Sequence, residues 1–194
     1  MKKILVTLFT LLFCLTSSVG LTKMYYEDLV KRNDLFYKKF SDIPFTGKIE
    51  SKITGTGSFI DGKRNGTWIY YHQNGQLRFK DQFKEGLRHG TFLSYYENGK
   101  LKYKGDYLND LKEGLWIEYH LRGSLKSKGN YKNGYKENLW IEYHFNGEIS
   151  NKGDYKNGKK EGSWVYYHDN GQLFSKGDYK NGKKDGSWVY YHDN

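Results

Sequence analysis

The sequence predicts an all-β fold, an elongated single-layer antiparallel β-meander of 24-residue hairpin repeats with an N-terminal cap. Composition is the first observation: 18% of residues are aromatic, 19 are Tyr, and Gly numbers 23 against one Pro. Aromatic residues favour strands, and frequent Gly marks turns. The second observation is a strict period of 24 residues, and the third is an Asn-Gly pair that recurs between strand-like segments.

The period is clearest in two aromatic columns. One contains Trp68, Phe92, Trp116, Trp140, Trp164 and Trp188, and the other Tyr71, Tyr95, Tyr119, Tyr143, Tyr167 and Tyr191. We expect these columns to form structural ladders, with Trp140 packed between Trp116 and Trp164. The repeat array therefore covers residues 44–194: a degenerate unit at 44–67, units at 68–91, 92–115, 116–139, 140–163 and 164–187, and a partial unit at 188–194.

Each unit contains two strands and two turns. Asn74-Gly75, Asn98-Gly99, Asn146-Gly147 and Asn170-Gly171 predict type I′ hairpin turns, and residues 180–186 predict the loop that returns to the next unit. Loops this short leave no room for a crossover helix, so consecutive strands are expected to be antiparallel neighbours.

The alternation of side chains along the strands predicts two faces. We assign Ile69, Tyr71 and Phe83 to one face, and Trp68 and Lys80 to the other.

The N-terminus has the layout of a secretory signal peptide at residues 1–20, followed by a cap segment at 21–43. Lys2 and Lys3 precede an apolar run, and cleavage is expected before Leu21. The protein is thus expected to be exported and to be periplasmic, on the cell surface or secreted. Lipid attachment at Cys14, the single cysteine, is the alternative, although a bulky Phe13 precedes it. One cysteine excludes an intramolecular disulfide.

The charge balance permits anionic partners, because 32 Lys and Arg face 22 Asp and Glu, for a formal charge of +10. One basic column, expected in the return loops, is a candidate edge for binding an anion or a partner: Arg64, Arg88, Lys112, Lys136, Lys160 and Lys184. Lys80, Lys104, Lys128, Lys152 and Lys176 form a second column, expected on the tryptophan face. The alternative is that these lysines keep the long sheet soluble and protect its edges from aggregation.

Two further columns contain residue types that occur in metal sites and active sites, but their arrangement does not match the geometry of such sites. His72, His120, His144, His168 and His192 recur two strands apart, about 9.6 Å, which is too far for shared zinc ligands. Glu113, Glu137, Glu161 and Asp185 lie in polar turns and are copies of one another, with no nucleophile and base beside them. We therefore expect no catalytic residue, metal or cofactor, and no enzymatic activity.

The repeat also resembles a known module. Gly162, Trp164, Tyr166-Tyr167, Asn170-Gly171 and Leu173, followed by Lys176-Gly177, Tyr179 and Gly182, resemble the bacterial variant of the MORN repeat. The segments Asp28–Phe40 and Pro44–Lys48 look like the N-terminal cap of YwqK-type antitoxin components of toxin–antitoxin systems. The resemblance covers about residues 25–194 and implies a binding scaffold. Asp110 and Asn138 depart from the pattern at glycine positions, and Phe92 departs at a tryptophan position.

The leading hypothesis is an exported, non-enzymatic repeat protein that binds a protein partner. One alternative is an antitoxin or immunity protein that neutralises a toxin by direct contact. Another is binding of an anionic lipid or glycan through the lysine columns. Export disfavours nucleic acid as a partner.

Overall fold

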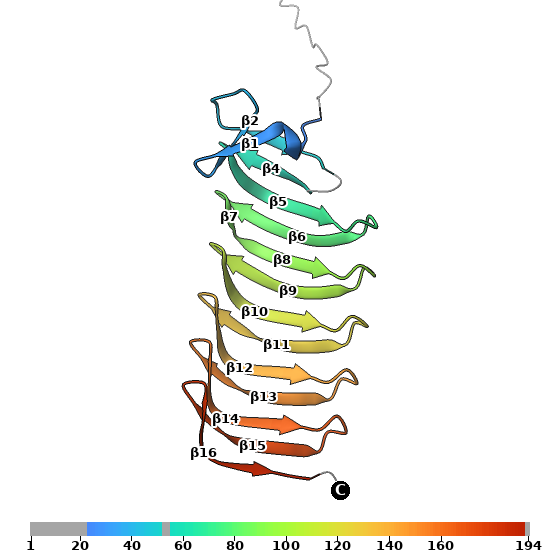
Figure 1. Cartoon of the computed structure of the whole chain (residues 1–194), viewed down its shortest axis with the longest axis vertical. Coiled ribbons are helices and arrows are strands. Elements are labelled where there is room, and N and C mark those ends of the chain that lie inside the picture. The colour runs from blue at the N-terminus through green and yellow to red at the C-terminus, as the bar shows by residue number, and fades with distance from the viewer. Residues whose placement is uncertain (1–22, 52–54, 193–194) are drawn as a thin grey trace, which may run out of the picture.

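One long antiparallel sheet dominates the computed structural model, which describes residues 23–51 and 55–192 (Figure 1). The predicted signal peptide at 1–20 and Cys14 lie outside the described residues. After a one-turn 3-10 helix at Tyr26–Asp28, the chain forms β1 (Leu29–Arg32), β2 (Leu35–Lys38), β3 (Gly47–Ile49), β4 (Thr56–Ile60), β5 (Lys63–Tyr71), β6 (Leu77–Lys84), β7 (Leu87–Arg88), β8 (Gly90–Tyr95), β9 (Leu101–Leu108), β10 (Leu111–Tyr119), β11 (Leu125–Lys132), β12 (Tyr135–Tyr143), β13 (Ile149–Lys156), β14 (Lys159–Tyr167), β15 (Leu173–Lys180) and β16 (Lys183–Tyr190).

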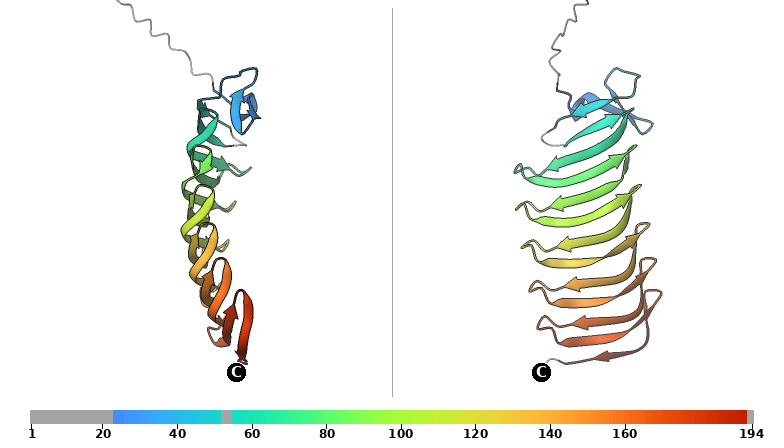
Figure 2. Two further views of the ribbon diagram at one scale, coloured as in Figure 1. Left: turned by 90° about the vertical axis from the view of Figure 1, so that its left-hand side faces the viewer. Right: turned by 180° about the vertical axis from the view of Figure 1, so that it is seen from behind.

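The strands follow one another across the sheet in chain order. The 14-stranded sheet runs from β3 to β16 without a crossover, and the short β7 pairs with β6. Seen from its edge, the sheet is a single layer (Figure 2). The predicted fold class, an elongated single-layer meander, is therefore confirmed. Among the described residues, no helix has the length and hydrophobicity needed to cross a membrane.

The type I′ turns lie between the units and not within them. Asn133 (φ 51°) and Gly134 (φ 82°) form a two-residue turn that pairs Lys132 directly with Tyr135. Positive φ at both central residues is the property of type I′ turns that suits an Asn-Gly pair. These return turns line the left-hand side of the sheet in Figure 1.

The turn prediction for Asn74-Gly75 and its equivalents is wrong. Gly75 has φ 82°, whereas Asn74 does not have a positive φ. The backbone N–H of His72 donates to the carbonyl of Gln76, and the Gly75 N–H donates to the carbonyl of His72. The register shifts beside Tyr71. A longer loop that ends in a left-handed glycine and a bulge accommodates the Asn-Gly pair just as well.

The two faces of the sheet are set by cross-strand pairing. Trp68 pairs with Asp81 and Ile69 with Lys80, so Lys80 shares the face of Ile69. Phe83 lies on the face of Trp68, with ring centroids 6.1 Å apart. The predicted assignment of Phe83 and Lys80 is therefore wrong, because a shift of one residue exchanges the faces.

The N-terminal segment covers one end of the tryptophan face. The hairpin of β1 and β2 places Phe36 against Phe59, with ring centroids 4.8 Å apart, and Phe59 meets Trp68 edge-on at 5.0 Å. Phe59 and Trp68 form the buried core cluster with Leu29, Phe45, Ile49 and Phe83, and the half-buried Phe36 packs against it. A single layer has no second sheet to cover it, so this cap gives the first strands their buried core.

Candidate binding surface on the tryptophan face

The tryptophan column forms a closed floor on one face of the sheet. The buried indole of Trp140 lies over Gly129, where an added Cβ would be 2.3 Å from a ring atom. Its Nε1–H donates to the carbonyl of Asn130 at 3.1 Å. The same arrangement places Trp68, Trp116, Trp164 and Trp188 on Gly57, Gly105, Gly153 and Gly177. A ligand on this face meets the groups that cover the indoles.

Tyrosine rings separate successive tryptophans. Trp140 contacts Tyr131 at 5.2 Å and Tyr155 at 6.1 Å, both edge-on. The prediction that Trp140 packs between Trp116 and Trp164 is therefore wrong. Strands two apart are about 9.6 Å from each other, and the tyrosines fill that space.

The second aromatic column lies on the opposite face. Its residues are Tyr71, Tyr95, Tyr119, Tyr143, Tyr167 and Tyr191, and lysines of the second basic column lie over its later rings. The Nζ of Lys152, for example, is 5.8 Å from the ring centroid of Tyr167. The two basic columns are thus on opposite faces, and the second column is not beside the tryptophans as predicted.

The first basic column is part of the tryptophan face and not of the return loops. Lys136 is the second residue of β12, and its Nζ lies 4.0 Å from the Trp140 centroid and 4.9 Å from that of Tyr155. The same contact to an aromatic ring is made by Arg64, Arg88, Lys112, Lys160 and Lys184. The predicted location in the return loops is therefore wrong: the return turn takes only two residues, so the strand already includes these cations.

Burial and π-contact change the chemistry of these lysines. Burial lowers the pKa of Lys112 and of Lys136 from the usual range of lysine, and attraction to nearby carboxylates opposes this shift. An ammonium over an aromatic ring is stabilised by about 0.5–2 kcal/mol, more as it loses water. These cations therefore stabilise the fold as well as presenting charge.

A polar recess of about 440 Å³ interrupts the face over β9 to β13. Farther along, the Nζ of Lys160 donates to the Tyr166 hydroxyl at 2.7 Å. The positions equivalent to Tyr166 hold Glu118 and Glu142, which line the recess together with Lys112 and Lys136. The recess therefore combines half-buried cations, carboxylates and the edges of aromatic rings.

Glu118 is fully engaged inside this recess. It accepts hydrogen bonds from Lys126 Nζ and from the Tyr103 hydroxyl, each at 2.9 Å, and from Ser127 Oγ at 3.5 Å. Burial raises the pKa of the Glu118 carboxyl, but the bonds from Lys126 and Tyr103 outweigh it, so the net pKa is lowered. Burial, with the Glu118 carboxylate second, raises the pKa of Tyr103 to about 12.

Glu142 has a different neighbourhood. Asn151 Nδ2 donates to it at 3.0 Å, and Ser150 occupies the position equivalent to Lys126. Sequence reasoning missed both glutamates, because it considered columns of constant chemistry. The signal that could have identified them is the change of residue type along one column: Tyr70, Ser94, Glu118, Glu142, Tyr166 and Tyr190.

The histidine and acidic columns hold neighbouring repeats together. Nε2–H of His72 donates to the carbonyl of Tyr95 at 3.0 Å, and the Tyr96 hydroxyl makes the equivalent bond to Tyr119 at 2.8 Å. The carboxylate of Glu113 accepts the backbone N–H of Asn133 at 2.8 Å. Within residues 23–51 and 55–192, no three His, Cys, Asp or Glu side chains group as metal ligands.

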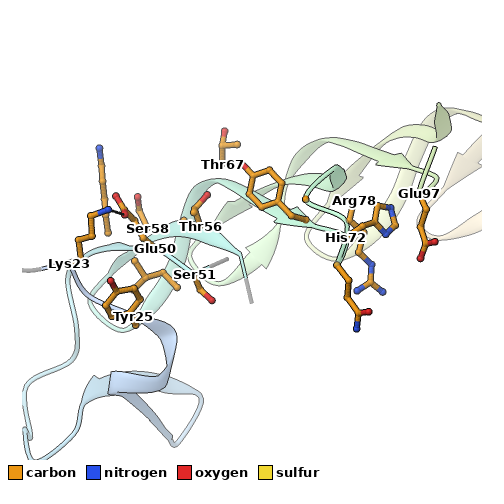
Figure 3. Close-up of a pocket in the computed structure, with 16 residues that line it drawn as sticks. Lys23, Tyr25, Glu50, Ser51, Thr56, Ser58, Thr67, His72, Arg78 and Glu97 are labelled. Carbon is orange, nitrogen blue, oxygen red and sulfur yellow. Dashed lines mark ion pairs between the residues drawn. The ribbon is translucent and has the colours of Figure 1, made fainter. Parts of the chain in front are cut away.

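A larger hollow of about 1620 Å³ lies on the opposite face, between the cap and the first hairpins. Figure 3 shows Lys23 and Glu50, an ion pair at 3.0 Å, at one end of it, and His72, Arg78 and Glu97 at the other. Its lining side chains are mostly polar and widely spread. The lining includes Ser51 and Thr56, and residues 52–54 between them in the chain are outside the described residues, so the hollow is not assigned as a site.

Comparison with known proteins identifies the repeat. The MORN repeat variant family matches at residues 64–85, 88–109, 112–133, 136–157 and 160–181, more than half of the chain. None of the curated proteins matches. The five matched segments contain the recess and, apart from Trp188 and Lys184, the tryptophan floor and the ring-bound cations. Repeats of this kind are in general non-enzymatic modules associated with binding or scaffold roles. The chain therefore belongs to the MORN repeat variant family.

Proposed function

We propose that this protein is an exported scaffold that binds a protein partner on its tryptophan face. The proposal rests on the recess that lies between two neighbouring repeats. A floor needed only for stability would repeat, as the tryptophans do, whereas Glu118 and Glu142 replace tyrosine or serine in two adjacent copies. The two glutamates that depart from this column both line the recess, and this indicates a binding role.

The chemistry of the recess suits a protein surface better than a simple anion. Lys112 and Lys136 are held over rings, and the adjacent carboxylates would repel a phosphate or an acidic glycan. A protein segment can present both donors and acceptors, as interface cores do. Anionic-lipid binding through this lysine column is therefore not part of the proposal.

An immunity or antitoxin role is the second candidate. It is favoured by the resemblance of Asp28–Phe40 and Pro44–Lys48 to the cap of YwqK-type antitoxins. The predicted signal peptide at 1–20 would then place the neutralised toxin outside the cytoplasm. Both candidates use direct protein contact.

Site-specific photocrosslinking tests the proposal. A photoreactive amino acid replaces Ser150, which lines the recess, in the cells that make the protein. The control replaces the exposed Asp178 on the opposite face. We expect a discrete protein adduct from position 150 that the charge reversal Glu142→Lys abolishes. The same adducts from both positions, or none from position 150, would refute the proposal.

A further inference from the structure

Two adjacent repeats each place a glutamate in the recess of the tryptophan face, and only the first of these glutamates forms an ion pair. Glu118 accepts hydrogen bonds from Lys126 Nζ and from the Tyr103 hydroxyl, each at 2.9 Å. Glu142, in the next repeat, accepts one side-chain hydrogen bond, from Asn151 Nδ2 at 3.0 Å. Within residues 23–51 and 55–192, no basic side chain forms an ion pair with Glu142. The array therefore contains one copy of this carboxylate site with its cation and one copy without it.

Two substitutions along the repeat explain the difference. The column that supplies the cation is basic in three successive repeats and changes to serine in the next: Arg78, Lys102, Lys126 and Ser150. The position of Tyr103 is occupied 24 residues later by Ser127, which pairs with Glu118 on one side and with Glu142 on the other. Short side chains thus replace a lysine and a tyrosine next to Glu142, and both serines line the recess.

The half-buried lysines of the recess do not supply the missing cation. The ammonium of Lys136 lies over aromatic rings, 4.0 Å from the Trp140 centroid. Lys112 is its equivalent one repeat earlier and lies over a tryptophan in the same way, at 4.2 Å. In that repeat Glu118 binds Lys126 in addition. The structure therefore shows that a ring-bound lysine and a second cation can share the surroundings of one such carboxylate.

The balance of charge in the recess allows the same arrangement at Glu142. The lysines and glutamates that line it are Lys112, Lys126, Lys136, Glu118 and Glu142. Lys126 is already paired with Glu118, and Ser150 lies two strands farther along the sheet, at about 9.6 Å. Repulsion over that distance is weak, because physiological salt screens exposed charges beyond about 8 Å. A cation beside Ser150 would meet Glu142 first.

The rim of the recess suits a side chain with an apolar stem. Phe145 is 73% exposed, and its ring stacks on that of His120, a residue of the lining, with centroids 4.0 Å apart. Lysine and arginine pack their aliphatic stems on apolar surfaces while the charged end reaches a polar group. Arginine also stacks its guanidinium on aromatic rings. An exposed ring above a carboxylate therefore favours a basic side chain over a small free cation.

We propose that the recess binds a lysine or arginine side chain of the protein partner, with its charged end on Glu142 and its stem against Phe145. The guest would take the place beside Glu142 that Lys126 takes beside Glu118. This inference rests on the proposed function, because it names the group that the partner inserts into that site. The partner would supply to one repeat the kind of residue that three earlier repeats supply themselves.

The array provides the substitution that tests whether a cation fits. Ser150→Lys installs the residue of the preceding repeat, and its side chain should pair with Glu142 and raise the urea midpoint of unfolding. The gain should disappear when Glu142→Gln is added. The control Ser163→Lys adds the same charge on the opposite face, and its effect should not depend on Glu142. If the effect of Ser150→Lys is the same with and without Glu142, the proposal is wrong.

A displayed library of random linear peptides tests the occupant. The peptides are selected on the wild-type protein and counter-selected on Ser150→Lys. We expect them to share a lysine or an arginine, and its replacement by norleucine or citrulline should weaken binding about tenfold or more, because a charge-assisted hydrogen bond is lost. Glu142→Gln should weaken binding to a similar extent. Asp178→Asn makes the same change of charge on the opposite face and should leave binding unchanged.

The outcomes separate this inference from the proposed function. Recess-dependent peptides that need no basic residue would overturn the inference and leave the proposed function standing. Failure to select any recess-dependent peptide would also overturn the inference, whereas the photoadduct at position 150 decides the proposed function independently. Dimerisation in sedimentation that Ser150→Lys abolishes would overturn the inference as well, because the occupant would then be a second copy of this chain.

Discussion

Asp81 and Phe92 are matched exceptions in the ladder. Asp81 occupies the position where the other copies have glycine beneath a ring, and Phe92 is the ring that should be tryptophan. The pairing of Lys80 with Leu93 places the two residues across from each other on adjacent strands. The buried Asp81 carboxylate lies 2.9 Å from Arg88 Nε. The smaller ring thus leaves room for the buried Asp81 carboxylate and its ion pair with Arg88.

This relationship predicts a specific coupling. Phe92→Trp should destabilise the protein by about 1–3 kcal/mol, because the indole would overlap Asp81. Asp81→Gly alone should also destabilise it, because Arg88 loses its carboxylate. The double variant should recover much of the loss, since it recreates the usual pair. Urea unfolding measures all three, and simply additive losses would contradict the account.

The close approach at Gly129 predicts a steric requirement. Gly129→Ala should cost about 1–3 kcal/mol or more in the free energy of unfolding, because its Cβ would lie 2.3 Å from a Trp140 ring atom. Adding Trp140→Phe should relieve part of that loss. If Gly129→Ala unfolds at the wild-type urea midpoint, the indole does not lie on this glycine.

The ring-bound lysines should contribute to stability, unlike lysines at the turns. Lys136→Ala should destabilise the protein by about 0.5–2 kcal/mol through loss of the contact to Trp140. Lys159→Ala, the matched change at the exposed return turn, should have an effect near zero. Equal effects of the two substitutions in thermal or urea unfolding would argue against the cation–π assignment.

The buried carboxyl of Asp81 and the half-buried carboxyl of Glu118 should give opposite pH dependences. Burial raises the pKa of Asp81 above 3.8, with attraction to Arg88 opposing it, so the native state holds this proton more tightly than the unfolded state. The contribution of Asp81 to stability should fall as pH rises above about 3.8. The pKa of Glu118 is lowered below 4.5, so its contribution is present above that value and is lost as pH falls through the folded pKa.

Urea titrations across this acidic range separate the two effects. The free energy of unfolding of wild type minus that of Asp81→Asn should decrease with rising pH. The corresponding difference for Glu118→Gln should increase. If both differences change in the same direction with pH, the environment of Asp81 or that of Glu118 is wrongly assigned.

Export gives a prediction about the mature chain. Mass spectrometry of the native protein should find its first residue at or near Leu21, because small residues precede that position. A retained Met1 in cytosolic protein would rule out cleavage, and a diacylglyceryl group on Cys14 would establish the lipoprotein form.

The period alone predicts the architecture, because Trp, Tyr and turn residues recur without insertion and each unit is too short for anything but a hairpin. The identity of the buried column also follows from Trp68 to Trp188. The architecture and the buried column can both be predicted because each copy repeats the same local sequence pattern.

The geometry of the turns, and the face of the sheet on which each side chain lies, could not be predicted as securely. Asn-Gly suits both a type I′ turn and a loop closed by a bulge, and the chain uses the first at Asn133-Gly134 and the second at Asn74-Gly75. Because the return turn is so tight, Lys136 falls inside a strand and its ammonium reaches Trp140. The recess was missed because Glu118 and Glu142 are informative only as departures from the repeat.

The histidine, glutamate and turn-asparagine bonds between hairpins point the same way along the chain. His72, Glu113 and Asn98 each use a side chain of an earlier hairpin to hold backbone atoms of a later one. Each finished hairpin therefore presents side chains that are already placed for the next to emerge. During synthesis the array can grow from its capped end as a template, each unit folding onto the one before it. Duplicating an internal unit would lengthen the sheet without requiring any new kind of contact.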